Sequence, residues 1–214
     1  MADAYTVFWT RERCSALRKQ GHVGEPLSLL FGGPHTSEPS FVRATVRPGD
    51  YLYPIAVYKG TLFVLGRVRV RSLLTLESFV DARPDLFAEH LREPPAWTQQ
   101  ASAGLTPRYV QALEAFERLR LAMPELRYLA PTCTGEAVEC EDGLPIRLDC
   151  AVPSDLLERL RYRSLRRERD LSKYIRDGRL TSILGVQGIY RLTEPSAREI
   201  DALLRAAPAS VTVV

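Results

Sequence analysis

A β-hairpin in the first half of the chain constrains the fold more than any other feature of the sequence. Two runs rich in β-branched and aromatic residues, Tyr51–Tyr58 and Thr61–Leu74, are separated only by Lys59 and Gly60. A two-residue connection that contains glycine, placed between two such runs, predicts an antiparallel hairpin. Pro54 lacks the N–H that a strand interior uses, so it predicts either an edge strand or a bulge at that point.

The second run of the hairpin alternates between apolar and basic residues. With a side-chain period of two, three arginines share one face of the strand, about 7 Å apart in succession. This stripe either contacts an anionic ligand such as phosphate, beside aromatic rings that offer stacking surfaces, or forms ion pairs with acidic residues of the same chain. Under the first interpretation, the candidate ligand-binding residues are Trp9, Tyr51, Tyr53, Arg67, Arg69 and Arg71.

Charge is unevenly distributed along the chain. Residues 1–80 carry a net charge of +4, residues 81–150 a net −5 and residues 151–214 a net +4. Of the 29 cations, 26 are arginine. A GC-rich genome accounts for that ratio, and so would selection for the bidentate contacts that arginine makes with carboxylate and phosphate.

A second basic cluster lies between residues 159 and 173, where seven cations and two acids give a net charge of +5. The pattern predicts that a helix starting at Ser154 runs into this cluster. It is then either an anion-binding surface or a solvated helix end, because Glu158, Glu168 and Asp170 are local partners at helical spacing. The candidate residues of this secondary basic patch are Arg163, Arg166, Arg167, Arg169 and Lys173.

Several further elements follow from local signals. An opening strand at residues 5–9 leads into a helix over residues 11–20 that Thr10 caps, and residues 41–46 are predicted to form a strand. Thr106 and Pro107 open a helix that extends to residue 123. Thr193 caps a last helix, whose predicted buried face consists of Ala197, Ile200, Leu203, Leu204 and Ala207.

These elements predict an α+β fold in which helices from the C-terminal half pack against a strand-rich first third. We expect a β-rich domain over residues 1–80, a Pro/Ala-rich connector over residues 81–105 and an α+β region over residues 106–214, packed together as one unit. No apolar run approaches the roughly 20 residues of a membrane span, and the first residues do not resemble a signal peptide. We therefore expect a cytoplasmic protein without membrane contact.

The sequence contains no established catalytic motif. Cys14 with His22 or His35 lacks the surroundings of a known nucleophile pair, and Cys133, Cys140 and Cys150 lack the close pairing of zinc ligands. We expect no catalytic residue, no metal and no cofactor. An enzyme whose site the sequence does not reveal remains the third functional interpretation.

A short series of motifs resembles a known superfamily. An R-P-G-D turn at residues 47–50 is followed by Y-P-I at residues 53–55 and by L-F-V-L-G-R-V at residues 62–68. This order of a Gly-Asp turn, a strand, a tight turn and a strand carrying G-R-V is similar to the PUA-like β-barrel superfamily, including its EVE and ASCH branches. The resemblance covers residues 4–76, whereas the Gly/Pro-rich loop at residues 21–40 departs from the usual pattern.

The resemblance implies a small mixed or antiparallel N-terminal barrel. It also implies a non-catalytic binding module for RNA, DNA or a nucleotide-like ligand. A protein-binding factor, such as a cytoplasmic immunity protein that neutralises a toxin, is the alternative from a different functional class. Charge segregation and the lack of catalytic motifs fit both interpretations.

Overall fold

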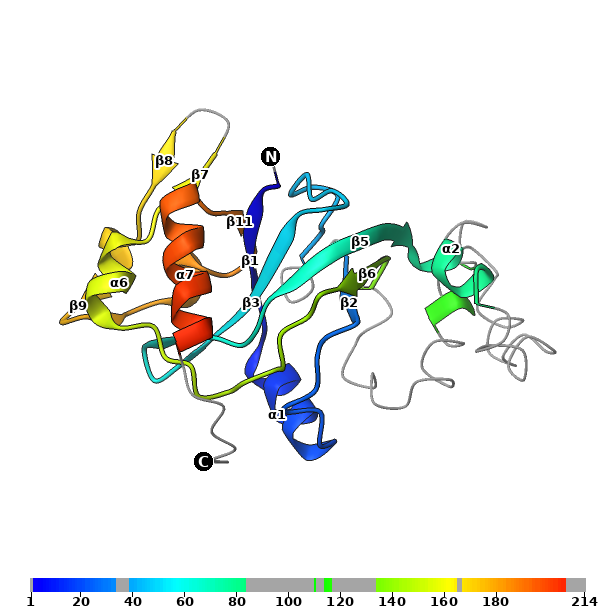
Figure 1. Cartoon of the computed structure of the whole chain (residues 1–214), viewed down its shortest axis with the longest axis horizontal. Helices are drawn as coiled ribbons and strands as arrows, with labels where there is room; N and C mark the ends of the chain where they lie inside the picture. Colours follow the sequence, from blue (N-terminus) through cyan, green and yellow to red (C-terminus); the bar gives the residue numbers. More distant parts are fainter. Residues whose placement is uncertain are drawn as a thin grey trace.

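The computed structural model describes residues 2–33, 39–83, 110, 114–116, 134–164 and 167–206 of the 214-residue chain. Strands and helices both occur along this part of the chain, and helices lie against a mixed sheet (Figure 1), so the predicted α+β class is confirmed. The helix expected at residues 106–123 falls mostly outside the described residues, as do Arg166 and Ala207. The proposed domain boundaries at residues 80 and 105 remain predictions.

One seven-stranded sheet organises the described residues. Its pairing order is β11-β1-β3-β5-β6-β2, with β4 also paired to β3. The β1–β3 pair is parallel and the other pairs are antiparallel, so the sheet is mixed. The strands are β1 (Ala4–Phe8), β2 (Leu29–Gly32), β3 (Tyr51–Tyr58), β4 (Thr61–Val64), β5 (Val68–Thr75), β6 (Glu136–Glu141) and β11 (Ile189–Arg191).

This sheet differs from the small barrel expected over residues 4–76. Among the described residues, the pairing path is open, with β2 and β11 as its two edges. Two of its strands, β6 and β11, lie in the second half of the chain. The first third of the chain therefore supplies most of the sheet but does not complete it.

The predicted hairpin is present as β3 and β4. Lys59 and Gly60 both have positive φ, 48° and 78°, as the two central residues of a type I′ turn require. The Pro54 carbonyl accepts a hydrogen bond from the Leu65 N–H at 2.8 Å. Leu65 lies in the short interruption of the partner strand between β4 and β5. Pro54 thus lies in a central strand beside an irregularity, so of the two predicted outcomes the bulge and not the edge strand applies.

The R-P-G-D turn has a structural role. The buried Asp50 carboxylate accepts hydrogen bonds from the backbone N–H groups of Arg47 at 2.8 Å and Asp3 at 2.9 Å. Gly49 has a φ of 92°, a conformation that residues other than glycine rarely adopt. The turn therefore joins the start of β3 to the residues that precede β1.

Each face of the sheet packs against its own helices. Leu52 and Val68 face a core that also contains Leu17 of α1 (Arg11–Lys19), whose N-cap is Thr10 as predicted. On the opposite face, Tyr53 and Ile55 pack against two helices from the second half of the chain. These are α6 (Ser154–Arg159) and α7 (Glu194–Ala206), and Figure 1 shows α7 lying across the front of the sheet.

The remaining described elements are small. Helix α2 (Leu76–Asp81) follows β5 and belongs to a third apolar cluster. The segment after α6 forms two short hairpins, β7 (Tyr162–Arg163) with β8 (Glu168–Arg169), and β9 (Ile175–Arg176) with β10 (Arg179–Leu180). The 3-10 turns η3 (Ser172–Tyr174) and η4 (Ile183–Gly185) flank the second hairpin. Within the described ranges, none of the helices has the length and apolar character needed to cross a membrane.

Two local expectations were wrong. Residues 41–45 form turns and not a strand, because the Glu136 carboxylate accepts hydrogen bonds from the N–H groups of Phe41 and Val42 and holds this segment curled. The helix that begins at Ser154 ends at Arg159 and does not continue through the basic cluster. Leu160, which follows it, is fully buried in extended conformation and redirects the chain into β7.

Candidate functional site

The first candidate site is the arginine stripe, and its first member is already paired. A guanidinium nitrogen of Arg67 lies 2.9 Å from a carboxylate oxygen of Asp201 on α7. The same guanidinium lies 5.3 Å from the centroid of the Tyr51 ring. Only 15% of the Arg67 side chain is exposed, so it lies between the sheet and α7 and not on an open surface.

Asp201 is the centre of a polar cluster between sheet and helix. It accepts hydrogen bonds from Arg205 at 2.7 Å and from the Tyr53 hydroxyl at 3.5 Å, in addition to the bond from Arg67. Burial by itself would raise the pKa of Asp201, but the hydrogen bond from Arg205 and the charge of Arg67 hold that pKa below its ordinary value. Burial and the nearby Asp201 carboxylate raise the pKa of Tyr53, which keeps the phenol protonated as a donor.

The other two stripe arginines face acidic residues of β6. Arg69 is the cross-strand neighbour of Glu141, and their charged groups are 3.5 Å apart. The register between β5 and β6 shifts next to Arg71, whose side chain is exposed. Arg71 acts on Glu139 of β6 through its charge. The pKa of Glu139 is lowered mainly by a hydrogen bond from Ser72, and the charges of Arg83 and Arg71 lower it further. The geometry of Arg67 and Arg69 therefore favours the ion-pair interpretation of the stripe.

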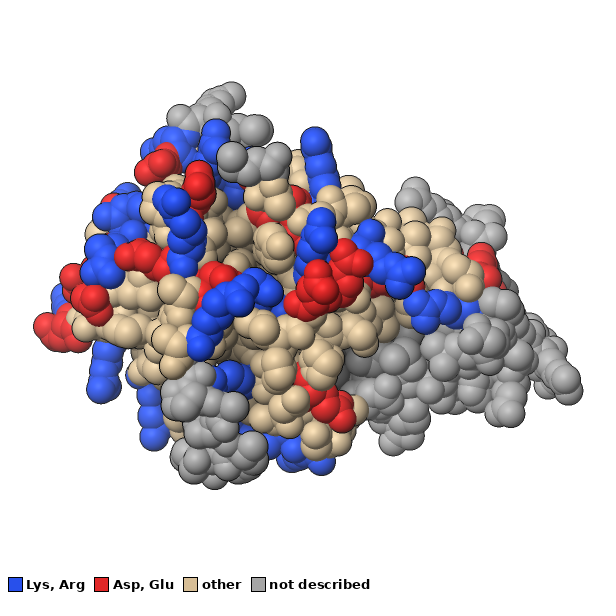
Figure 2. Space-filling model, viewed as in Figure 1, with Lys and Arg blue, Asp and Glu red and all other residues tan. Residues whose placement is uncertain are grey.

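The six predicted ligand-binding residues do not form one surface. Tyr51, Tyr53 and Arg67 meet beside α7, whereas Trp9 is buried in the core on the opposite face of the sheet. There the Arg13 guanidinium lies 4.2 Å from the Trp9 ring centroid. Figure 2 shows that basic and acidic side chains are interleaved on the face that carries α7.

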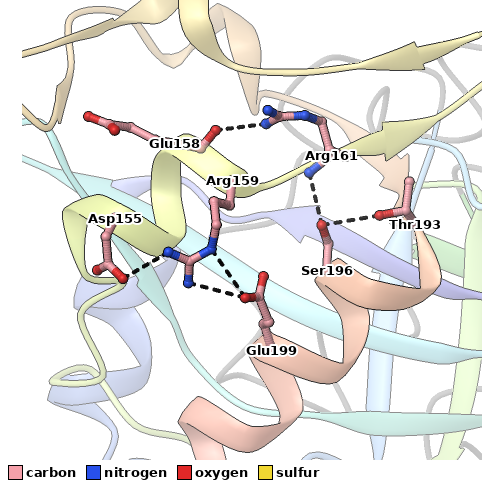
Figure 3. Close-up of polar contacts among 7 residues, drawn as sticks. All are labelled: Asp155, Glu158, Arg159, Arg161, Thr193, Ser196 and Glu199. Atoms are coloured by element: carbon pink, nitrogen blue, oxygen red, sulfur yellow. Dashed lines mark hydrogen bonds and ion pairs between the residues drawn. The ribbon is translucent and has the colours of Figure 1, made fainter.

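A shallow groove of about 360 Å³ lies where β7 and the residues after α6 meet the start of α7. Figure 3 shows Arg159 placed between Asp155 and Glu199, at 3.0 and 3.1 Å. The Ser196 hydroxyl oxygen accepts hydrogen bonds from the Arg161 N–H at 2.9 Å and from the Thr193 hydroxyl at 3.2 Å. These contacts bind α6 to α7, so the groove is a structural junction.

The described residues of the second basic patch lie in the β7–β8 hairpin and in the 3-10 turn η3 that follows it. Arg169 is half-buried and stacks on Tyr190, with 4.2 Å between its guanidinium carbon and the ring centroid. It also donates a hydrogen bond to the Gly185 carbonyl at 2.6 Å. Arg163, Arg167 and Lys173 are exposed. Arg169 therefore has a structural role through its contacts with Tyr190 and Gly185, while the other three side chains are open to solvent.

Sequence reasoning missed two further cations of the same region, Arg176 and Arg179. Both are exposed and stand on either side of the Asp177-Gly178 turn of the second hairpin. The signal for them was available, because R-D-G-R combines a type I′ turn dipeptide with two flanking arginines. We call Arg163, Arg167, Lys173, Arg176 and Arg179 the hairpin cations.

The hairpin cations share two properties. No ion pair joins any of them to an acidic residue in the part of the chain that the structure describes. The segment that carries them, residues 161–179, has a net charge of +5. Its acidic residues include Asp170, which is engaged by hydrogen bonds from Ser172. Both hairpins lie at the end of the molecule opposite α2 (Figure 1).

The described cysteines, Cys14, Cys140 and Cys150, are free thiols. Burial raises the pKa of Cys14 to about 11 and that of Cys140 to about 12. Cys133 lies outside the described residues. Among the residues that are described, no group of three or more His, Cys, Asp or Glu side chains is arranged to hold a metal ion.

The raised thiol pKa values predict slow alkylation. Because the thiolate is the nucleophile, iodoacetamide at about pH 8 should modify Cys14 and Cys140 of the native protein at least tenfold more slowly than free cysteine. Peptide mass spectrometry after timed quenching measures both rates. The same reaction in urea is the control, and there both sites should react at the rate of a free thiol. Equal rates in native and unfolded protein would contradict the prediction.

Comparison with known proteins gives structural matches of low TM-score and low identity. No family model matches the chain, and no curated protein matches its sequence. Two crystal structures of ZmASCH mutants from Zymomonas mobilis resemble it with a TM-score of 0.40 each. The serine-to-alanine mutant is 11% identical, covering 94% of this chain and 96% of that one. The tyrosine-to-phenylalanine mutant is 10% identical, covering 94% and 98%.

Proposed function

We infer that this chain is a nucleic-acid-binding protein and that the hairpin cations contact the phosphate backbone. The observation that carries this proposal is the gathering of five exposed cations within 17 residues, each without an ion pair to a described acidic residue. Phosphate backbones attract such a surface because each neutralised phosphate releases condensed counterions. Four of the five are arginines, which bind phosphate through two parallel hydrogen bonds.

The state of each arginine decides whether it is available to a phosphate. An ion-paired arginine must first give up its carboxylate, whereas an unpaired exposed arginine loses only water. By this criterion, Arg67 and Arg69 are engaged in ion pairs and Arg71 is the accessible member of the stripe. The proposal therefore places the main contact on the hairpin cations, and of the stripe only Arg71 is a secondary candidate.

The test compares two triple variants that remove the same charge. Arg163→Ala/Arg167→Ala/Lys173→Ala removes three hairpin cations. The control, Arg69→Ala/Arg159→Ala/Arg198→Ala, removes one half-buried and two exposed arginines that have carboxylate partners, Glu141, Asp155 with Glu199, and Glu194. Fluorescence anisotropy with labelled RNA and DNA of about 20 nucleotides, at about 50 and 200 mM salt, measures affinity and its salt dependence.

We expect the hairpin variant to bind at least tenfold more weakly than the unsubstituted protein at low salt. The slope of log affinity against log salt concentration should decrease in magnitude by about one for each phosphate that the variant no longer neutralises. The control variant should retain most of the affinity, because its arginines already have partners. Equal weakening in both variants, or no binding to any nucleic acid at about 50 mM salt, would contradict the proposal and favour a protein partner.

A further inference from the structure

The hairpin β9–β10 contains an arrangement that is unfavourable for the free protein. Arg176 and Arg179 are direct cross-strand neighbours, so two positive side chains stand opposite each other at the tip. Like charges in that position destabilise a hairpin. Asp177 lies in the turn between them, yet no ion pair joins it to either arginine in the described structure. A single phosphate between the two guanidinium groups would turn the repulsion into two attractions.

The tip is held in place by the rest of the molecule. A Cβ atom on Gly178 would lie 2.7 Å from the Cβ of Ser154, which shows how closely the turn packs on the start of α6. The Leu180 N–H donates a hydrogen bond to the Gly60 carbonyl at 2.8 Å, and Leu180 itself is buried. The two arginines thus project from a fixed base, which reduces the entropy lost when they bind a ligand.

The same hydrogen bond brings a second hairpin tip against the first. Gly60 belongs to the turn between β3 and β4, and Tyr58, two residues earlier, is an exposed residue with 51% of its surface open to solvent. The Arg11 guanidinium lies 6.0 Å and the Lys59 ammonium 5.4 Å from the centroid of that ring. The exposed Tyr58 ring is thus two residues from a turn that touches β10, where a Cβ atom on Gly60 would lie 3.4 Å from the Cβ of Arg179.

We propose that these two tips form a site for single-stranded nucleic acid, with a phosphate between Arg176 and Arg179 and an unpaired base stacked on Tyr58. This inference rests on the proposed function and specifies its ligand. An aromatic ring at a protein surface stacks on a base only when that base is not enclosed in a duplex. The base would displace Arg11 or Lys59 from its place over the Tyr58 ring, and the displaced cation would then contact a neighbouring phosphate. The site contacts a base face and phosphates, which RNA and DNA share.

The test uses a single strand of about 12 nucleotides that carries 2-aminopurine, whose fluorescence falls when it stacks on an aromatic ring. Tyr58→Ala should weaken single-strand binding about tenfold, abolish the fluorescence change and leave the salt dependence unchanged. Tyr58→Phe, which keeps the ring, should bind as the unsubstituted protein does.

Arg176→Ala/Arg179→Ala tests the phosphate contact. This double variant should weaken binding and reduce the slope of the salt dependence by about one to two, because one or two phosphates are no longer neutralised. Thermal melting establishes that each variant is folded.

The outcomes separate this inference from the broader proposal. If Tyr58→Ala changes neither the affinity nor the fluorescence, or if the unsubstituted protein binds duplex as tightly as single strand, the single-strand site is excluded. The broader proposal still stands in that case, provided that the hairpin triple variant loses affinity. Arg179→Glu gives an independent readout, because a carboxylate opposite Arg176 should raise the melting temperature slightly and abolish single-strand binding. A fall in melting temperature with binding intact would overturn the assignment.

Discussion

Replacing Ile200 by alanine should lower the free energy of unfolding by about 2–5 kcal/mol. Ile200 lies on α7 with no exposed surface, in the core that joins this helix to β3 and α6. Removing its side chain leaves a cavity between a helix and a sheet, and a rigid sheet cannot close over it. Urea denaturation followed by circular dichroism gives the value, provided that the slope of the transition is unchanged.

Leu203→Ala is the matched control for this prediction. The pattern of α7 predicts that Leu203 faces inward like Ile200, but Leu203 is only partly buried, at the edge of the same core. A side chain that already contacts water loses less on truncation, so this change should cost less than about 2 kcal/mol. If the two variants lost equal stability, the orientation of α7 on the sheet would be different from the one described.

Replacing Asp201 by alanine should cost about 2 kcal/mol at neutral pH. The substitution removes the hydrogen-bond acceptor of Arg67 and Tyr53, both of which lie mostly shielded from water between β3 and α7. The larger part of the loss comes from leaving the Arg67 charge without its carboxylate. Arg198→Ala is the control, because its partner Glu194 is exposed and their separation is 3.6 Å. That control should change stability by less than about 1 kcal/mol.

The contribution of Asp201 should depend on pH in a defined direction. Burial raises the pKa of this carboxyl, but the hydrogen bond from Arg205 and the charge of Arg67 outweigh that effect. The pKa of Asp201 is therefore lower in the folded protein than in the unfolded chain. Its stabilising effect is therefore fully present above the unfolded pKa of about 3.9 and is lost as pH falls through the folded pKa. The stability difference between the unsubstituted protein and Asp201→Ala should be constant from about pH 6 to 8 and shrink below about pH 4. A difference that grows on acidification would contradict the assignment.

The elements that sequence reasoning predicted correctly are those fixed by neighbours in the chain. The β3–β4 turn depends only on Lys59 and Gly60, which adopt positive φ, and helix α1 begins where the Thr10 side chain accepts a hydrogen bond from the Arg13 N–H. Helix α7 follows from its apolar spacing. In each case, the residues that decide the conformation lie within a few positions of one another.

The elements that were missed depend on partners far away in the sequence. The turns at residues 41–45 are held by Glu136, which lies 95 positions after Phe41. Arg67 and Asp201 are separated by 134 positions, so the stripe could not be recognised as part of an ion-pair cluster. Glu158, Glu168 and Asp170 were expected to be local partners of the basic cluster at helical spacing, but the helix ends at Arg159, before the buried Leu160. In each of these cases, tertiary contacts determine the structure and override the preference of the local sequence pattern.

The pairing of β1 has a consequence for the order in which the chain folds. One side of β1 pairs with β3, about 50 residues further on, whereas its other side pairs with β11, where Tyr5 is opposite Arg191. During synthesis, the β11 side of β1 stays without its partner until residues 189–191 have left the ribosome. Contacts between such distant segments slow folding, because a long loop must close before they form. A nascent chain released before residue 189 would therefore expose an unpaired strand edge, the kind of surface on which two incomplete chains associate.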